Sequence, residues 1–229
     1  MLKLMKLEIK KYKKKGNLKG IIIANLIILA FVGLSIFEKK PNDNQMIFDN
    51  WNDIFLYTST FVRVAFTIFA GVLISRLIIS EYKNKTINIL FTYPINRKKV
   101  MITKLFIIAA FAFITMILSN IFISSILYLL NIFINFTSEA LTMEILVQNS
   151  INIFVYSLLY AFISLIPVYI GILRKSGTSV IVTSVILITV LNSHTLSSII
   201  ITPIIFAILG LISSYLFIKD IEKIDVPNF

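Results

Sequence analysis

The sequence predicts an all-α, multi-pass membrane protein, and three observations support this fold class. Hydrophobic residues make up 58% of the 229 residues and charged residues only 14%, whereas soluble domains are about half apolar and a quarter charged. The mean hydropathy is +0.91. The apolar residues form stretches close to the length of about 20 residues that a helix needs to cross a bilayer. We therefore expect a single helical transmembrane domain over residues 1–229.

Six apolar stretches are candidate spans. They cover about residues 18–37, 54–79, 100–133, 151–173, 178–191 and 196–218. The first is expected to be retained, because 33–37 is a poor signal-peptide cleavage site. The third exceeds one crossing, so it must tilt, project or break, with Asn120 and Asn131 as candidate edges. Pro167 lies inside the fourth, where neighbouring groups can satisfy the carbonyl that it frees. The fifth is short for a full crossing.

Polar connections separate these spans. Residues 38–53 form a polar loop that would place Trp51 at the membrane–water interface, where aromatic anchors are common. A second loop is expected over 134–150, which contains no lysine or arginine. Residues 174–177 and 192–195 have the composition of tight turns.

Residues 1–17 are rich in lysine and precede the first span. Leu2, Met5, Ile9 and Tyr12 recur at helical spacing and form one apolar stripe. A lysine-rich helix with such a stripe suits the membrane surface. We expect an amphipathic helix on the inner leaflet; a frayed basic tail is the alternative.

The net charge of +11 arises from 22 lysines and arginines against 11 acidic residues. With the N-terminus inside and six spans, most basic residues fall in cytosolic segments, and Lys39 and Lys40 fall in an outer loop. The positive-inside rule then predicts that both termini are cytosolic. The basic balance is thus explained by the membrane, and no nucleic-acid partner is expected.

The sequence carries no recognisable catalytic or metal-binding constellation. There is no cysteine, and His194, the single histidine, falls in a predicted turn where a solvated role competes with a functional one. The sequence contains neither His-Glu-x-x-His nor the phosphate-binding Gly-x-x-x-x-Gly-Lys-Ser/Thr. We therefore expect no catalytic residues, no metal and no cofactor bound by this chain. Any ATP would be hydrolysed by another chain.

Arg63 is an ionisable residue deep inside the second predicted span. Such residues are costly in a membrane and are candidates for function. Arg63 could line a polar cavity or bind an anionic group of a substrate; the alternative is snorkelling to the headgroups. Together with Arg63, the residues Asn120, Tyr156 and Tyr160 are candidates for a translocation path. Further candidates are Ser119, Ser124, Ser125 and Tyr169. For any of these, hydrogen bonding between packed helices is the alternative. Because the acidic residues fall in loops or tails, ion-driven transport is disfavoured.

A polar stretch over residues 80–99 separates the second span from the third. Ile87, Leu90 and Phe91 share one face of a short helix at i, i+3 and i+4, and Pro94 ends it. Such a helix can bind in the groove of a partner protein. The alternative is a helix lying on the lipid surface.

This segment and the start of the third span carry a motif. It consists of Glu81, Lys85, Thr86, Leu90, Pro94, Arg97 and Lys104. Together with the predicted topology, it resembles the permeases of ABC-2-type ABC transporters. Lys85 departs from the pattern, because these permeases usually have glycine there.

The resemblance implies a permease subunit that pairs with a second permease, identical or different, around a central path. Each permease would bind a cytosolic ABC ATPase subunit, and that subunit would hold ATP and Mg²⁺. Residues 84–93 would be the coupling helix, Glu81 would contact the ATPase or the N-terminal helix, and Arg97 would hold the loop. The implied ATPase-coupling residues are Glu81, Lys85, Thr86, Ile87, Leu90, Phe91, Pro94 and Arg97.

The small outer loops most resemble those of permeases of bacitracin-resistance, lantibiotic-immunity and related peptide exporters. This implies a bacterial cell membrane and efflux of a hydrophobic or amphipathic substrate, such as an antimicrobial peptide or antibiotic. Two other classes stay open: a non-transporting sensor or regulatory subunit, and an integral membrane enzyme. The lack of a signalling domain weighs against the first, and the lack of paired catalytic groups weighs against the second.

Overall fold

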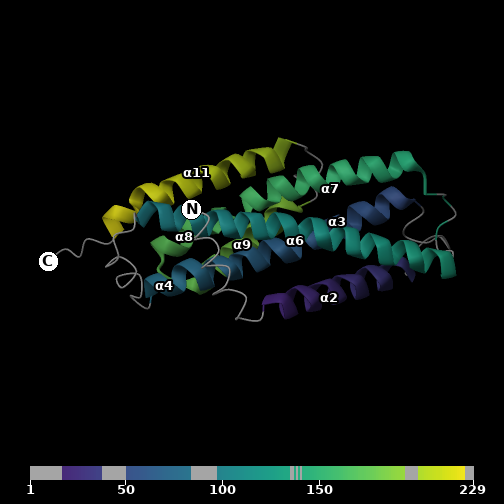
Figure 1. The fold of residues 1–229 in the computed structure, drawn as a ribbon, viewed down its shortest axis with the longest axis horizontal. Helices are drawn as coiled ribbons and strands as arrows, with labels where there is room; N and C mark the ends of the chain where they lie inside the picture. The colour runs from purple at the N-terminus through teal and green to yellow at the C-terminus, as the bar shows by residue number, and fades with distance from the viewer. Residues whose placement is uncertain are drawn as a thin grey trace. The chain divides into compact units, whose positions relative to one another are not determined.

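The computed structural model describes residues 17–37, 50–83, 97–134, 137, 139, 141–193 and 201–224, and regular structure in these residues is helical throughout (Figure 1). The elements are α2 (Asn17–Phe37), α3 (Trp51–Ile74), the π-helix η1 (Ser75–Ile79), α4 (Ser80–Lys83), α6 (Arg97–Ile134), α7 (Met143–Ile163), α8 (Ile166–Leu173), α9 (Gly177–Leu191) and α11 (Ile201–Ile224). The predicted all-α fold is confirmed.

Five helical stretches of the described chain are long and apolar enough to cross a membrane. They are Lys19–Ile36, Trp51–Tyr82, Lys98–Ile134, Met143–Leu173 and Ile201–Lys219. The apolar helix α9 has 15 residues, about 22 Å at 1.5 Å per residue, which is short of a hydrocarbon core of about 30 Å. Large apolar side chains such as Phe133 and Leu34 are exposed along these helices. Such surfaces need lipid as their solvent, so the chain is a multi-pass membrane protein.

The helix boundaries differ from the predicted ones in three places. Helix α3 begins at Trp51, and η1 and α4 continue it to Lys83. Helix α6 runs unbroken through Asn120 and Asn131. Helix α7 begins at Met143, so the predicted loop over 134–150 is wrong for its last eight residues. The first turns of α7 contain polar residues, and their composition is typical of a loop. In the structure these residues are helical and line a cavity described below.

The predicted fourth span is interrupted directly before Pro167. Helix α7 ends at Ile163, and α8 begins at Ile166 with the proline in its first turn, where its missing N–H costs no helical hydrogen bond. The Ser213 hydroxyl of α11 donates to the Ile166 carbonyl at 3.0 Å. The break is thus stabilised by a neighbouring helix. The predicted turn at 174–177 is confirmed, with Lys175 in the left-handed region (φ 48°).

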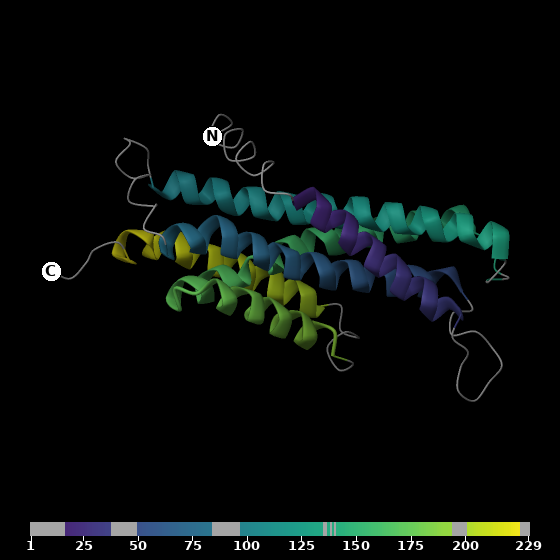
Figure 2. The same ribbon diagram turned by 90° about the horizontal axis from the view of Figure 1, so that it is seen from below.

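The chain divides into two compact units. The first, here called the α8–α11 unit, comprises residues 1–15, 66–113 and 158–229. Among its described residues, η1, α8, α9 and the first half of α6 enclose a core that includes Ile78, Ile108 and Val168, each fully buried. Figure 2 shows α8 and α9 in green beside α11 in yellow. Glycines permit close packing here: a Cβ at Gly171 would overlap Val180 of α9.

The second unit, here called the α2 unit, comprises residues 16–65 and 114–157. Helix α2 buries a stripe of Ile28, Val32 and Ile36, and the Phe31 ring stacks on Phe61 of α3 with centroids 6.4 Å apart. The other faces of α2 are apolar and exposed. This pattern is typical of a helix that packs on one side and contacts lipid on the other.

Trp51 corrects a prediction. Instead of standing in the predicted loop over 38–53, it is the first residue of α3, and it is only 1% exposed. Its backbone N–H donates to the Glu139 carboxylate and its indole N–H donates to the Glu139 carbonyl, both at 2.9 Å. The carboxylate thus caps the positive end of α3. Glu139 fixes the connection between α6 and α7 to the start of α3.

Three predicted features lie outside the described residues. They are the amphipathic N-terminal helix, the coupling helix over 84–93 and His194.

Candidate functional site

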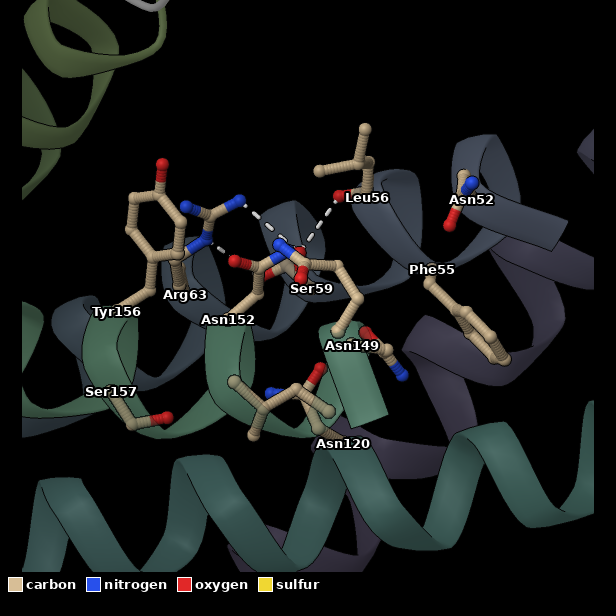
Figure 3. Close-up of a pocket in the computed structure, with 12 residues that line it drawn as sticks. Asn52, Phe55, Leu56, Ser59, Arg63, Asn120, Asn149, Asn152, Tyr156 and Ser157 are labelled. Atoms are coloured by element: carbon tan, nitrogen blue, oxygen red, sulfur yellow. Dashed lines mark hydrogen bonds between the residues drawn. The ribbon is translucent and has the colours of Figure 1, made fainter. Parts of the chain in front are cut away.

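A polar cavity of about 200 Å³ lies inside the α2 unit, among α3, α6 and α7 (Figure 3). It is lined by Asn52, Phe55, Leu56, Ser59, Arg63, Asn120, Gln148, Asn149, Asn152, Ile153, Tyr156 and Ser157. Side-chain amides predominate among these residues. Such a concentration is unusual between apolar helices, because an amide in a membrane needs hydrogen-bond partners.

Arg63 is held at this cavity by groups one turn earlier on its own helix. Its Nε donates to the Ser59 carbonyl at 3.0 Å. Its Nη2 donates to the hydroxyls of Ser59 at 3.2 Å and Thr60 at 3.0 Å. Its Cζ lies 4.6 Å from the centroid of the Tyr156 ring, a cation–π geometry. Figure 3 shows the guanidinium beside this ring. Arg63 is therefore preorganised in the cavity wall.

The electrostatic character of the cavity follows from its lining. Arg63 brings a positive charge, and none of the described residues that line the cavity is acidic. The amides of Asn149 and Asn152 add neutral donors and acceptors. The Asn120 amide, which is 3% exposed, donates to the Met116 carbonyl at 2.9 Å. A guanidinium beside neutral amides is suited to an anionic oxygen group.

A second cavity, of about 680 Å³, adjoins the first within the same unit. The two share Phe55, Asn149 and Ile153. The second cavity is otherwise lined by Ile121, Ser124, Ser125, Tyr128, Leu129, Leu141, Met143, Leu146 and Ser150. Its character is mainly apolar, so the pair of cavities is amphipathic.

The predicted path residues are only partly brought together. Arg63, Asn120 and Tyr156 line the polar cavity, and Ser124 and Ser125 line the apolar one. The other three predicted residues line neither cavity. Tyr160 is 3% exposed and belongs to the α8–α11 unit, Tyr169 packs against the core of that unit, and Ser119 is buried in α6.

Sequence reasoning identified Tyr156 but missed the contribution of the first turns of α7. Gln148, Asn152 and Tyr156 recur at i, i+4 and i+8 and thus share one helix face. The signal was present in the sequence, but residues 143–150 were assigned to a loop. A polar stripe of period 4 that continues into an apolar stretch would have revealed it.

A second candidate feature lies in the α8–α11 unit. It joins the first and last residues of the motif that runs from Glu81 to Lys104. Lys104 of α6 is completely buried and forms an ion pair with Glu81 of α4. Its Nζ also donates to the Leu77 carbonyl at 3.1 Å. Leu77 lies in η1, where the Ser80 N–H bonds to Ser75, five residues back. π-Helical turns are often found at functional sites.

The other predicted coupling residues are not described. Lys85, Thr86, Ile87, Leu90, Phe91 and Pro94 lie outside the described residues, and Arg97 is the first residue of α6 with an undescribed side chain. The structure therefore locates Glu81 and Lys104 at the two ends of this segment.

Comparison with known proteins extends these observations. The sequence pattern of the family described as "ABC-2 family transporter protein" matches residues 4–210. The chain is also 38% identical over 226 residues to "Uncharacterized protein YcbO" of Bacillus subtilis (strain 168), which covers 97% of this chain and 99% of that protein. No solved structure matches the chain.

Proposed function

Because the chain belongs to the ABC-2 family of transporter proteins, we propose that it is the permease subunit of an ATP-driven exporter. The observation that carries this proposal is the family match over residues 4–210, which covers the first four long apolar stretches of the described chain and the start of the fifth. The exported substrate is hydrophobic or amphipathic, in the class of antimicrobial peptides and antibiotics.

The energy would come from a separate cytosolic ABC ATPase subunit, which would hold ATP and Mg²⁺. Two permeases, either two copies of this chain or this chain with a related one, would form the path. The membrane would be a bacterial plasma membrane, and the basic segments support an orientation with both termini in the cytoplasm.

Coupling would pass through residues 84–93. The described chain supports this assignment from both sides of the segment, because α4 ends at Lys83 and α6 begins at Arg97. The Glu81–Lys104 ion pair joins these two helices. A movement of the segment would therefore act on both helices together, and alternation between two states would follow ATP occupancy. Glu81 could contact the ATPase as well, and Arg97 would hold the loop.

The amphipathic cavity pair supports the substrate class. A purely apolar substrate would make no hydrogen bonds with Arg63 and the amides around it. A sugar would leave the apolar cavity without an apolar group to contact. A substrate that combines a polar group with an apolar part suits this lining.

The direct test is reconstitution of the full chain with its cognate ABC ATPase subunit. ATP would be supplied on the side of the proteoliposome membrane where the ATPase lies. The movement of a fluorescently labelled lantibiotic across that membrane would be followed. We expect movement that requires ATP and stops when the ATPase is omitted. A complex that hydrolyses ATP without moving this probe or labelled bacitracin would contradict the export of such peptides.

The coupling assignment has its own test. Leu90→Asn and Phe91→Asn should each reduce co-purification of the ATPase, because they remove the apolar face of the coupling helix. Leu173→Asn is the matched control, since Leu173 is exposed at the end of α8. Equal co-purification of all three variants would show that residues 84–93 do not bind the ATPase.

A further inference from the structure

We propose that the two adjoining cavities of the α2 unit bind one anionic amphiphile, with a phosphate or carboxylate headgroup beside Arg63 and a hydrocarbon chain in the apolar cavity. This inference deepens the proposed function by naming the chemistry of the substrate. The binding itself requires no ATPase, so it can be measured separately.

The headgroup assignment rests on the polar cavity. Arg63 is already oriented by Ser59, Thr60 and the Tyr156 ring, so little conformational entropy is lost when it binds an anion. A volume of about 200 Å³ holds several groups of the size of water, which occupies about 30 Å³ in the liquid. That space accommodates a small anionic headgroup.

The position of the ligand's hydrocarbon chain is inferred from the boundary between the two cavities. Phe55, Asn149 and Ile153 line both cavities, and we place the ligand across the boundary that these three side chains form. A hydrocarbon chain that moves from the bilayer into the apolar cavity gains little binding free energy, because lipid is as apolar as the cavity wall. The apolar cavity therefore orients the ligand, and the headgroup decides the affinity. Selectivity should follow headgroup charge.

Trp51 provides a reporter for the apolar cavity. It is the single tryptophan of the chain and is 1% exposed. Its ring lies 5.6 Å from the Phe55 ring and 6.3 Å from the Tyr128 ring, centroid to centroid. Both neighbours line the apolar cavity. A brominated chain in that cavity should quench Trp51 fluorescence more than brominated lipid in the surrounding bilayer does.

The experiment uses the full chain in nanodiscs of unlabelled phosphatidylcholine with small additions of brominated phosphatidylglycerol or brominated phosphatidylcholine. We expect the anionic lipid to quench at a mole fraction about tenfold lower than the zwitterionic lipid. Charged hydrogen bonds of this kind typically have such an effect. Arg63→Gln should abolish the difference, and Arg63→Lys should keep most of it. Arg174→Gln is the control, since Arg174 is exposed in the turn after α8.

Competition by single-chain amphiphiles against the brominated lipid tests whether the charge of the headgroup determines binding. Dodecyl phosphate or dodecanoate should relieve the quenching in the wild-type chain, whereas dodecyl maltoside, which has the same chain but no charge, should not. Equal quenching by both brominated lipids, or a preference that survives Arg63→Gln, would overturn the proposal. If the wild-type chain showed this lipid selectivity but exported no peptide in the reconstitution test, only the proposed function would be contradicted.

Discussion

Lys104 and Glu81 form an ion pair that joins α6 to α4, with the side chains 1% and 12% exposed. The Lys104 ammonium also bonds to the Leu77 carbonyl in the π-helix η1. An ammonium at this depth is tolerated only because charge and hydrogen bonds compensate for its lost hydration. The pair therefore fixes the register of α6 against the end of the α3–η1–α4 stretch.

Breaking this pair should destabilise the protein strongly. Glu81→Gln leaves the Lys104 charge buried without its carboxylate, a change that typically costs about 3–5 kcal/mol. We expect a lower midpoint of thermal unfolding in detergent, measured by circular dichroism. Lys175→Gln, in the exposed turn after α8, is the control and should leave the midpoint unchanged.

A double variant separates the ion pair from packing effects. Glu81→Lys combined with Lys104→Glu restores opposite charges and should be more stable than either single change. A double variant as unstable as the sum of the two singles would show that the charge pairing contributes nothing.

Gly210→Ala should destabilise the contact of α11 with the end of α7. A Cβ at this position would overlap the Phe162 carbonyl oxygen, which also accepts the Leu165 N–H at 3.0 Å and is therefore held at the helix break. Overpacking of this kind typically costs about 1–3 kcal/mol. The free energy of unfolding of the purified chain in mixed micelles would measure the loss.

Gly33→Ala is the matched control for that change. A Cβ at Gly33 meets nothing within 4 Å, and alanine is favoured over glycine in a helix by about 1 kcal/mol. This variant should be as stable as the wild type or slightly more so. If both glycine variants lost the same stability, close packing at Gly210 would not be the cause.

Glu139→Ala should loosen the start of α3. The change removes the carboxylate that accepts the Trp51 N–H, and loss of a helix cap typically costs about 1 kcal/mol. Amide hydrogen exchange in the first turn of α3 should accelerate about fivefold. Glu144→Ala is the control, because Glu144 is exposed in the first turn of α7. Unchanged exchange in Glu139→Ala would mean that the cap does not stabilise α3.

The predicted orientation can be checked by labelling, because the chain has no cysteine. In intact cells, a membrane-impermeant maleimide should label His194→Cys from outside and should reach Lys98→Cys only after the membrane is opened. The reason is the concentration of basic residues on the predicted cytosolic side. Labelling of position 98 in intact cells would reverse the topology.

The sequence by itself determined the environment and the fold class of this protein. Apolar stretches of spanning length can be satisfied only by lipid, and lipid permits few structures other than helices. The same reasoning located α2, α9 and the turn at 174–177, and it identified Arg63 as a residue that either lines a cavity or snorkels to the headgroups. Charge distribution gave the predicted orientation, and the motif from Glu81 to Lys104 pointed to the family.

Only the tertiary structure decided which polar residues meet. Gln148 and Asn149 resemble a loop in composition, and only the packing of α7 against α3 shows that they face Arg63. Tyr160 satisfies the same sequence criteria as Tyr156, yet it belongs to the other unit, because a step of four residues along α7 moves a side chain about 6 Å along the helix axis. Lys104 and Glu81 are 23 residues apart in sequence, and their pairing depends on the register of two helices. Side-chain type fixes what a residue needs, whereas packing fixes which residue supplies it.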